Sequence, residues 1–247
     1  MKILINGACG RMGKVVTQRG LAGYCNCEGI VRVDKHIDSS DNGEILGNIS
    51  DCKEKIDCII DFSLPTGTKD LLNYATENNI PIVIATTGHN SDELQMIEEA
   101  SQKIAIFKSG NMSIGIATLA TLAGQVAKIL PDANVEIIET HHNQKLDVPS
   151  GTALMLAESI KKERENSYFN VGRHEYGKRE SDEIGIHSIR LGNVIGEHEI
   201  LINTGSETIS LKHQAHTRDL FAEGSLIAAQ FIKDKPSGMY NMYNIVG

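Results

Sequence analysis

Short apolar runs separated by longer mixed segments fill the first half of the chain. Five of these runs have the pattern of short buried strands, at residues 2–6, 29–34, 56–62, 80–84 and 104–107. The segments between them predict helices, at residues 14–18, 68–78 and 91–102. Because strands and helices alternate, this half is predicted to form a parallel sheet with helices on both faces.

The pattern changes after Met112. Residues 113–130 are apolar and Ala-rich and predict one helix, which Pro131 ends. The next segments predict a strand at residues 134–138, a helix at residues 153–160 and an exposed hydrophilic connection at residues 161–182. Three strands, at residues 186–190, 197–203 and 208–213, and a last helix at residues 218–232 are predicted after them. The second half therefore has a different architecture from the first.

Runs of strands after an alternating series indicate a second domain with its own sheet. We therefore predict an α/β fold with a Rossmann-type, dinucleotide-binding parallel-sheet domain at residues 1–112. A second α+β domain with an open mixed sheet is predicted at residues 113–218. The apolar faces of this sheet could pair across subunits. Residues 219–247 are expected to return to the first domain.

A glycine-rich turn, GACGRMG, joins the first strand to the first helix at residues 7–13. Glycines at such a turn let the backbone approach a pyrophosphate. Its G-x-x-G-x-x-G spacing differs from the commoner G-x-G-x-x-G, so the turn alone is a moderate signal. Ala8 and Val15 exclude the rival reading as a P-loop, which needs Gly and Ser or Thr there.

An acid ends the second predicted strand and supports a nucleotide site. Asp34 lies 21 residues after Gly13, close to the spacing of a carboxylate that holds the adenosine ribose hydroxyls. Lys35 and His36 follow it, and a cation there can accept a 2′-phosphate, so NADPH could be used as well as NADH or in place of it. A solvated basic pair explains Lys35 and His36 equally well. Two later strand ends carry small polar residues that are candidates to line the nicotinamide, at Thr86, Thr87, Ser109, Gly110, Asn111 and Met112.

The segment ETHHNQKLDVPSGTA, at residues 139–153, lies between a predicted strand and a predicted helix, where open α/β proteins place ligands. His141, His142 and Lys145 can carry positive charge. Ser150 can cap the helix, and the backbone N–H groups of its first turn, at Gly151 and Thr152, would attract a carboxylate or phosphate. Pro-Ser-Gly-Thr alone favours an ordinary capped helix after a basic loop. The His-His-x-x-Lys directly upstream favours an anion site.

Composition narrows the function classes. Of the 247 residues, 40% are hydrophobic and 23% are charged, as in soluble globular proteins. A net charge of -8 argues against nucleic acid as a partner. No apolar run approaches the ~20 residues that a membrane span needs. Five cysteines without a signal peptide predict a reducing compartment, and therefore the cytoplasm.

Taken together, these residues resemble the 4-hydroxy-tetrahydrodipicolinate reductase family, known also as dihydrodipicolinate reductases, over nearly the whole chain. Residues 139–153 match the family's E-x-H-H-x-x-K-x-D-x-P-S-G-T-A signature, and GACGRMG matches its nucleotide loop. Gly196-Glu197-His198 and residues 213–218 match its later strands and its return to the first domain. The resemblance implies NAD(P)H-dependent reduction of 4-hydroxy-tetrahydrodipicolinate to tetrahydrodipicolinate with loss of water, in the diaminopimelate route to lysine. It also implies that the second domain, at residues 113–218, binds substrate and mediates oligomerisation, in a homotetramer assembled through the second domains.

The resemblance assigns roles residue by residue. His141 and Lys145 would be the catalytic pair, and the small dicarboxylate substrate would be bound by His142, Ser150, Gly151 and Thr152. The cofactor, NADH or NADPH, would be bound by Gly7, Ala8, Cys9, Gly10, Arg11, Met12, Asp34, Lys35, Ala85, Thr86, Thr87, Ser109, Gly110, Asn111 and Met112. Ala85 departs from the family, in which many members have Gly.

The residues fit this chemistry independently of the family resemblance. Hydride addition to an electron-poor C=C–C=N system builds negative charge, which a lysine beside the nascent carbanion or enamine nitrogen can quench with a proton. A non-catalytic dinucleotide-sensing module is the alternative, but it gives no reason for His141 and Lys145 to share a loop. A metal-dependent hydrolase is a third class. His213 and His216 could face one ion only in an irregular turn, no H-E-x-x-H motif exists, and we expect no metal.

Overall fold

The computed structural model describes residues 1–37 and 44–247. The chain divides into two compact units. Unit 1 consists of Met1–Ser113 and Asp219–Ile245, and unit 2 of Ile114–Arg218. Within the described residues, no helix is both long enough and apolar enough to cross a membrane.

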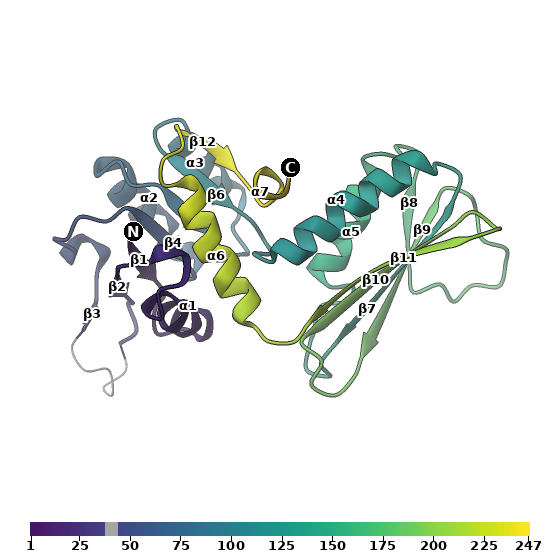
Figure 1. The fold of residues 1–247 in the computed structure, drawn as a ribbon, viewed down its shortest axis with the longest axis horizontal. Helices are drawn as coiled ribbons and strands as arrows, with labels where there is room; N and C mark the ends of the chain where they lie inside the picture. Colours follow the sequence, from purple (N-terminus) through teal and green to yellow (C-terminus); the bar gives the residue numbers. More distant parts are fainter. Residues whose placement is uncertain (38–43) are drawn as a thin grey trace. The chain divides into compact units, whose positions relative to one another are not determined.

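Unit 1 is built on a seven-stranded sheet in the order β12-β6-β5-β4-β1-β2-β3, and every neighbouring pair is parallel (Figure 1). The strands are β1 (Lys2–Asn6), β2 (Gly29–Val33), β3 (Ile45–Leu46), β4 (Cys58–Asp61), β5 (Ile82–Ile84), β6 (Ala105–Lys108) and β12 (Gly238–Tyr240). The helices are α1 (Arg11–Leu21), α2 (Thr68–Glu77), α3 (Ser91–Ser101) and α6 (Asp219–Ile232); a last short helix, α7 (Tyr243–Val246), ends the chain. The predicted parallel sheet is confirmed.

Both faces of this sheet are covered, which explains why its strands are apolar throughout. On one face, Leu4, Ile59 and Ile82 pack with Leu71 of α2 and Ile97 of α3. On the other face, the ring of Phe107 meets that of Phe231 on α6 edge to face at 6.3 Å. The segment after residue 218 thus contributes a covering helix, and also the edge strand β12 beside β6.

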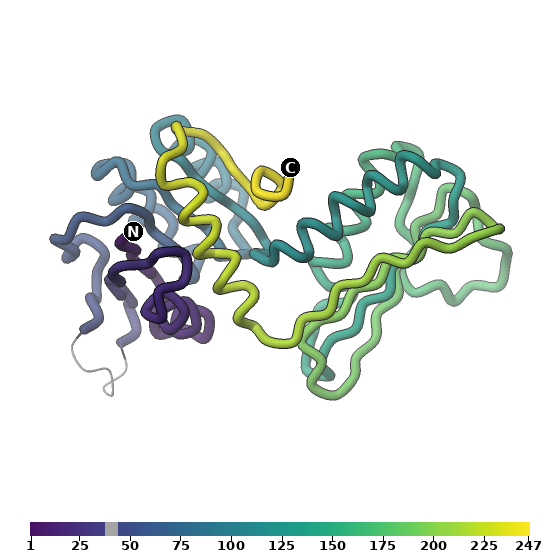
Figure 2. Tube along the Cα trace, viewed as in Figure 1, coloured from purple at the N-terminus to yellow at the C-terminus, as the bar shows by residue number. Residues whose placement is uncertain are grey.

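Unit 2 contains a five-stranded mixed sheet in the order β11-β10-β7-β9-β8 (Figures 1 and 2). β10 is antiparallel to β11 and β7, whereas β9 is parallel to β7 and β8. The strands are β7 (Asn134–His141), β8 (Tyr168–Val171), β9 (Glu183–Arg190), β10 (Gly196–Asn203) and β11 (Thr208–Ala215). Helices α4 (Ile114–Ile129) and α5 (Gly151–Lys161) pack on one face of the sheet. Buried and less buried positions therefore alternate along β7 and β10.

The prediction of an exposed connection at residues 161–182 is correct for most of the segment, but it missed a strand and a buried arginine. The segment contains β8, which pairs in register with β9. Its Arg164 is buried, and the guanidinium donates a hydrogen bond of 2.8 Å to the carbonyl of Ala133. A polar composition misled the prediction because buried polar groups of this kind are satisfied by partners distant in sequence. The two-residue strand β3 was also not predicted.

Candidate active site

The turn after β1 accepts only glycine at two positions. Gly7 has a φ of +82°, and a Cβ built on it would lie 2.7 Å from the backbone of Phe62. A Cβ on Gly13 would collide with the carbonyl of Gly7. The turn therefore folds tightly between the end of β4 and the start of α1.

Helix α1 begins at Arg11 directly after this turn. Gly10 is its N-cap, no side chain caps it, and no acid lies in its first turn. Such a helix start presents N–H groups and a partial positive charge, which suit a diphosphate. The turn and the helix start thus fit the dinucleotide that the sequence predicts.

Asp34 is buried at the end of β2 and fixed beside the turn. One carboxylate oxygen accepts a hydrogen bond of 2.8 Å from the N–H of Cys9, and the other accepts 2.9 Å from the N–H of His36. Each oxygen retains a second lone pair. The carboxylate can therefore accept ribose hydroxyls while it holds the turn.

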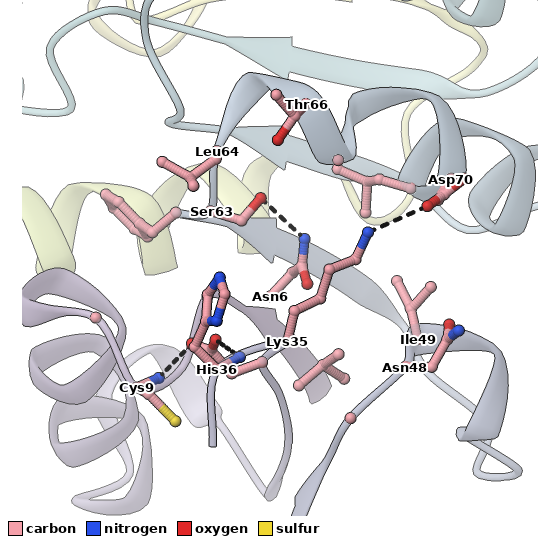
Figure 3. A pocket seen from close by; sticks show the side chains of 18 residues that line it. Asn6, Cys9, Lys35, His36, Asn48, Ile49, Ser63, Leu64, Thr66 and Asp70 are labelled. Carbon is pink, nitrogen blue, oxygen red and sulfur yellow. Dashed lines mark hydrogen bonds and ion pairs between the residues drawn. The ribbon is translucent and has the colours of Figure 1, made fainter. Parts of the chain in front are cut away.

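A cavity of about 410 Å³ opens beside these groups in unit 1 (Figure 3). Five predicted cofactor residues line it: Gly7, Cys9, Gly10, Asp34 and Lys35. It is also lined by polar residues that were not predicted: Asn6, Asn48, Ser63, Thr66 and Asp70. Asn6 and Ser63 lie at or just beyond the ends of β1 and β4, so the rule that ligands bind at strand ends could have found them.

The other predicted cofactor residues lie outside the lining of this cavity: Ala8, Arg11, Met12, Ala85, Thr86, Thr87, Ser109, Gly110, Asn111 and Met112. Thr86 is buried, and its hydroxyl donates a hydrogen bond of 2.6 Å to Asp61. The same buried carboxylate accepts hydrogen bonds from Asn6 and Ser63. Asp61 therefore ties together the ends of β1, β4 and β5, where the cavity and the Thr86 segment meet.

In unit 2, Glu139 lies near the end of β7 with no exposed surface. One of its oxygens lies 2.5 Å from Nδ1 of His141, and the other accepts 3.1 Å from the N–H of Ser150. The guanidinium of Arg190, on β9, donates to both oxygens at 2.9 Å. Burial raises the pKa of Glu139, but the hydrogen bonds from His141 and Arg190 outweigh it and hold the pKa well below its usual range. Glu139 is therefore a buried carboxylate.

Ser150 is the N-cap of α5, as predicted, and its hydroxyl accepts 3.2 Å from the N–H of Ala153. The residue is buried, and its hydroxyl also lies 3.3 Å from Nε2 of His198, on β10. Burial, followed by the nearby His141, lowers the pKa of His198 to about 3, so this imidazole is neutral. Arg190 and His198 had no predicted role. Only the G-E-H triplet pointed to His198.

Lys145 and Asp147 form an ion pair of 2.8 Å in the loop before α5. A hydrogen bond from Lys145 is the largest of the effects that lower the pKa of Asp147, and the backbone of Gly151 contributes. A carboxylate thus already sits against the lysine and the start of α5. This arrangement fits the predicted preference of the loop for carboxylates.

The remaining predicted residues of unit 2 lie around this loop. His142 is half-buried, and its Nδ1 has no hydrogen-bond partner among the described residues. Gly151 is exposed at the start of α5, and Thr152 is half-buried beside it. Among the described residues, no three His, Cys, Asp or Glu side chains are placed to hold a metal ion.

Comparison with known proteins covers both units. The family described as "Dihydrodipicolinate reductase, N-terminus" matches residues 1–112, and "Dihydrodipicolinate reductase, C-terminus" matches residues 115–246. The 4-hydroxy-tetrahydrodipicolinate reductases of Clostridium tetani and Clostridium novyi are 43% and 40% identical to the chain. These matches cover 98% and 99% of the chain, and 95% and 98% of the two relatives.

A solved structure is also similar. The dipicolinate-bound dihydrodipicolinate reductase from Paenisporosarcina sp. TG-14 superimposes with a TM-score of 0.79 at 26% identity, over 99% of each chain. The fold, the two matched halves and the full-length relatives agree. The chain belongs to the dihydrodipicolinate reductase family, whose members are NAD(P)H-dependent oxidoreductases.

Proposed function

We propose that the chain reduces 4-hydroxy-tetrahydrodipicolinate to tetrahydrodipicolinate with loss of water, using NADH or NADPH, in the diaminopimelate route to lysine. The observation that carries this function is full-length similarity to reductases of that name. The loop before α5 supports it, because it brings Lys145 and Asp147 to the start of that helix. Unit 1 would be the dinucleotide-binding domain and unit 2 the substrate-binding domain.

The residues of unit 1 would hold the cofactor. The glycine turn and the start of α1 would bind the diphosphate, and Asp34 would bind the adenosine ribose. The reduced nicotinamide would supply the hydride. We assign the strand-end residues to its surroundings: Ala85, Thr86, Thr87, Ser109, Gly110, Asn111 and Met112. Thr86 is buried, so it would support the neighbouring residues through the hydrogen bond from its hydroxyl to Asp61.

The residues of unit 2 would hold the dicarboxylate and move the proton. Lys145 would donate a proton to the carbon or nitrogen that becomes electron-rich on reduction, with His141 as its acid–base partner. The carboxylate of Asp147 marks where a substrate carboxylate would find the lysine and the helix start. His142, Gly151 and Thr152 would complete the binding of the two carboxylates.

Family membership supports a proposal for the assembly and the location of the protein. We propose a homotetramer formed through unit 2, in the cytoplasm. The face of the unit 2 sheet opposite α4 and α5 supports this assembly, since it carries Ile189, which is 44% exposed on β9.

The test is the oxidation of NADH and of NADPH, followed by absorbance, with substrate generated enzymatically. The proposal requires turnover that depends on both the substrate and the protein. Binding of cofactor without turnover would favour the alternative, a dinucleotide-sensing module, and would overturn the catalytic assignment.

A further inference from the structure

A closed ring of contacts joins four residues of unit 2: Glu139, the predicted catalytic His141, His198 and Ser150. Glu139 contacts Nδ1 of His141 at 2.5 Å, and the ring of His141 meets the ring of His198 edge to face, with centroids 5.2 Å apart. Nε2 of His198 lies 3.3 Å from the Ser150 hydroxyl, and the N–H of Ser150 returns to Glu139 at 3.1 Å. The ring joins β7, β10 and the start of α5. All four residues are buried.

Donors and acceptors in this ring can be assigned. The Ser150 hydroxyl accepts from the N–H of Ala153 and keeps its proton and a second lone pair, so it can pair with Nε2 of the neutral His198 in either tautomer. Glu139 is ionised and can only accept. Nδ1 of His141 must therefore carry a proton. The other imidazole nitrogen, Nε2, can then exchange a proton with a ligand.

Arg190 closes the arrangement from β9. Its guanidinium binds both oxygens of Glu139 at 2.9 Å and also donates 2.6 Å to the carbonyl of Asp147. The same arginine thus contacts the carboxylate that orients His141 and the backbone two residues after Lys145. A Cβ on Gly196 would lie only 3.0 Å from Nε2 of His141, so the imidazole also packs closely against β10. The imidazole is therefore held on several sides.

We infer that Glu139 and Arg190 are positioning residues, which hold His141 as the Nδ1-protonated tautomer and tie it to the loop of Lys145 and the start of α5. The effect of these residues on catalysis rests on the proposed function. The tautomer of His141 is inferred from the contacts alone. Ser150 belongs to this ring and would act by holding the helix start beneath the substrate.

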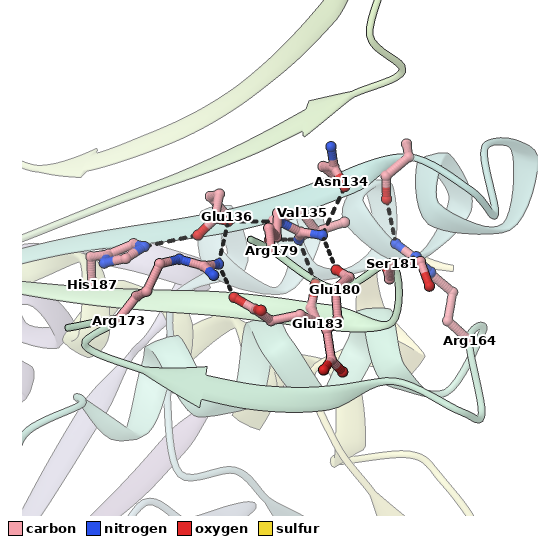
Figure 4. Close-up of polar contacts among 11 residues, drawn as sticks. Asn134, Val135, Glu136, Arg164, Arg173, Arg179, Glu180, Ser181, Glu183 and His187 are labelled. Carbon is pink, nitrogen blue, oxygen red and sulfur yellow. Dashed lines mark hydrogen bonds and ion pairs between the residues drawn. The ribbon is translucent and has the colours of Figure 1, made fainter. Parts of the chain in front are cut away.

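Unit 2 provides a matched control on the same strand. Glu136 lies three residues before Glu139, and its side chain is on the opposite face of β7 because side chains alternate along a strand. It contacts Arg173 and Arg179 at 3.3 and 3.0 Å and His187 at 2.8 Å (Figure 4). Glu136→Gln therefore removes the same kind of charge from a Glu–Arg–His cluster that does not contact His141.

The first experiment is 15N NMR of the imidazoles in the full-length protein, with His141 assigned by loss of its signals in His141→Gln. We expect the wild-type spectrum to show a protonated Nδ1 and an unprotonated Nε2 for neutral His141. An Nε2-protonated tautomer, or an even mixture, would overturn the inference. This result requires neither activity nor a positioning variant, so it decides even if the proposed function fails or Glu139→Gln does not fold.

The second experiment compares Glu139→Gln with Glu136→Gln in steady-state assays. Loss of a residue that orients a functional imidazole should lower kcat on the order of 100-fold while the Kd for reduced cofactor, which unit 1 binds, stays within about twofold. Glu136 lies on the sheet face proposed for assembly, so the oligomeric state of Glu136→Gln is checked first. With that state unchanged, Glu136→Gln should keep kcat within about threefold of wild type. Equal losses in both variants would mean that Glu139 serves folding only. Absence of activity in the wild type would instead contradict the proposed function.

Discussion

The ammonium of Lys35 lies 3.2 Å from the carboxylate of Asp70, at the edge of the cavity in unit 1 (Figure 3). Lys35 is the residue predicted to accept a 2′-phosphate. Because Asp70 already pairs with it, a phosphate would have to compete with this carboxylate. We therefore expect Asp70 to disfavour NADPH.

We expect this pair to influence the choice between the two cofactors. Lys35→Ala should lower kcat/KM for NADPH by about tenfold and leave kcat/KM for NADH nearly unchanged, because only NADPH carries the extra phosphate. Asp70→Asn should shift the ratio of kcat/KM values toward NADPH, because the competing charge is removed. The measurement is kcat/KM for each cofactor in the three proteins. Equal effects on both cofactors would show that Lys35 is only a surface charge.

Glu139 should make the free energy of unfolding of the chain depend on pH in the acidic range. Its pKa in the folded state is below its ordinary value of 4.5, so its contribution is complete above that pH and is lost as the pH falls. At pH 7, Glu139→Gln should destabilise the chain by about 3–5 kcal/mol, because it breaks a buried ion pair. That difference should shrink below pH 4.5, by up to about 1.4 kcal/mol per pH unit. Denaturant unfolding between pH 3 and 7 measures it, and a difference that stays constant with pH would contradict the assignment.

The pH dependence of the reaction tests the proposed proton donor. If Lys145 is the proton donor, kcat/KM falls at alkaline pH as the free enzyme loses that proton. The measurement is the profile of kcat/KM against pH in the wild type. A profile that stays flat well into alkaline conditions would argue that Lys145 does not donate the proton.

Features set by neighbours in sequence were predictable. Ser150 was recognised as a helix cap because the acceptor and the N–H that it binds are three residues apart. The first strand was placed at residues 2–6, where β1 lies, because an unbroken apolar run meets a glycine turn. The parallel sheet followed from the alternation of such runs with helices.

Features set by distant partners were not predictable. Arg190 contacts Glu139 across 51 positions of sequence, and His198 contacts Ser150 across 48. No spacing rule links such residues, because the register between β7, β9 and β10 brings them together. The burial of Arg164 within residues 161–182 was missed for the same reason, since its partner lies 31 residues away.

The most direct test of the account is the turnover of Lys145→Ala with enzymatically generated substrate and NADH. Removing the proposed proton donor should lower kcat by ~100-fold or more, because general acid catalysis contributes 10²–10⁴ in rate. The Kd for NADH should stay at the wild-type value, because the residues of its cavity lie in unit 1. Turnover of Lys145→Ala at the wild-type rate would contradict the account.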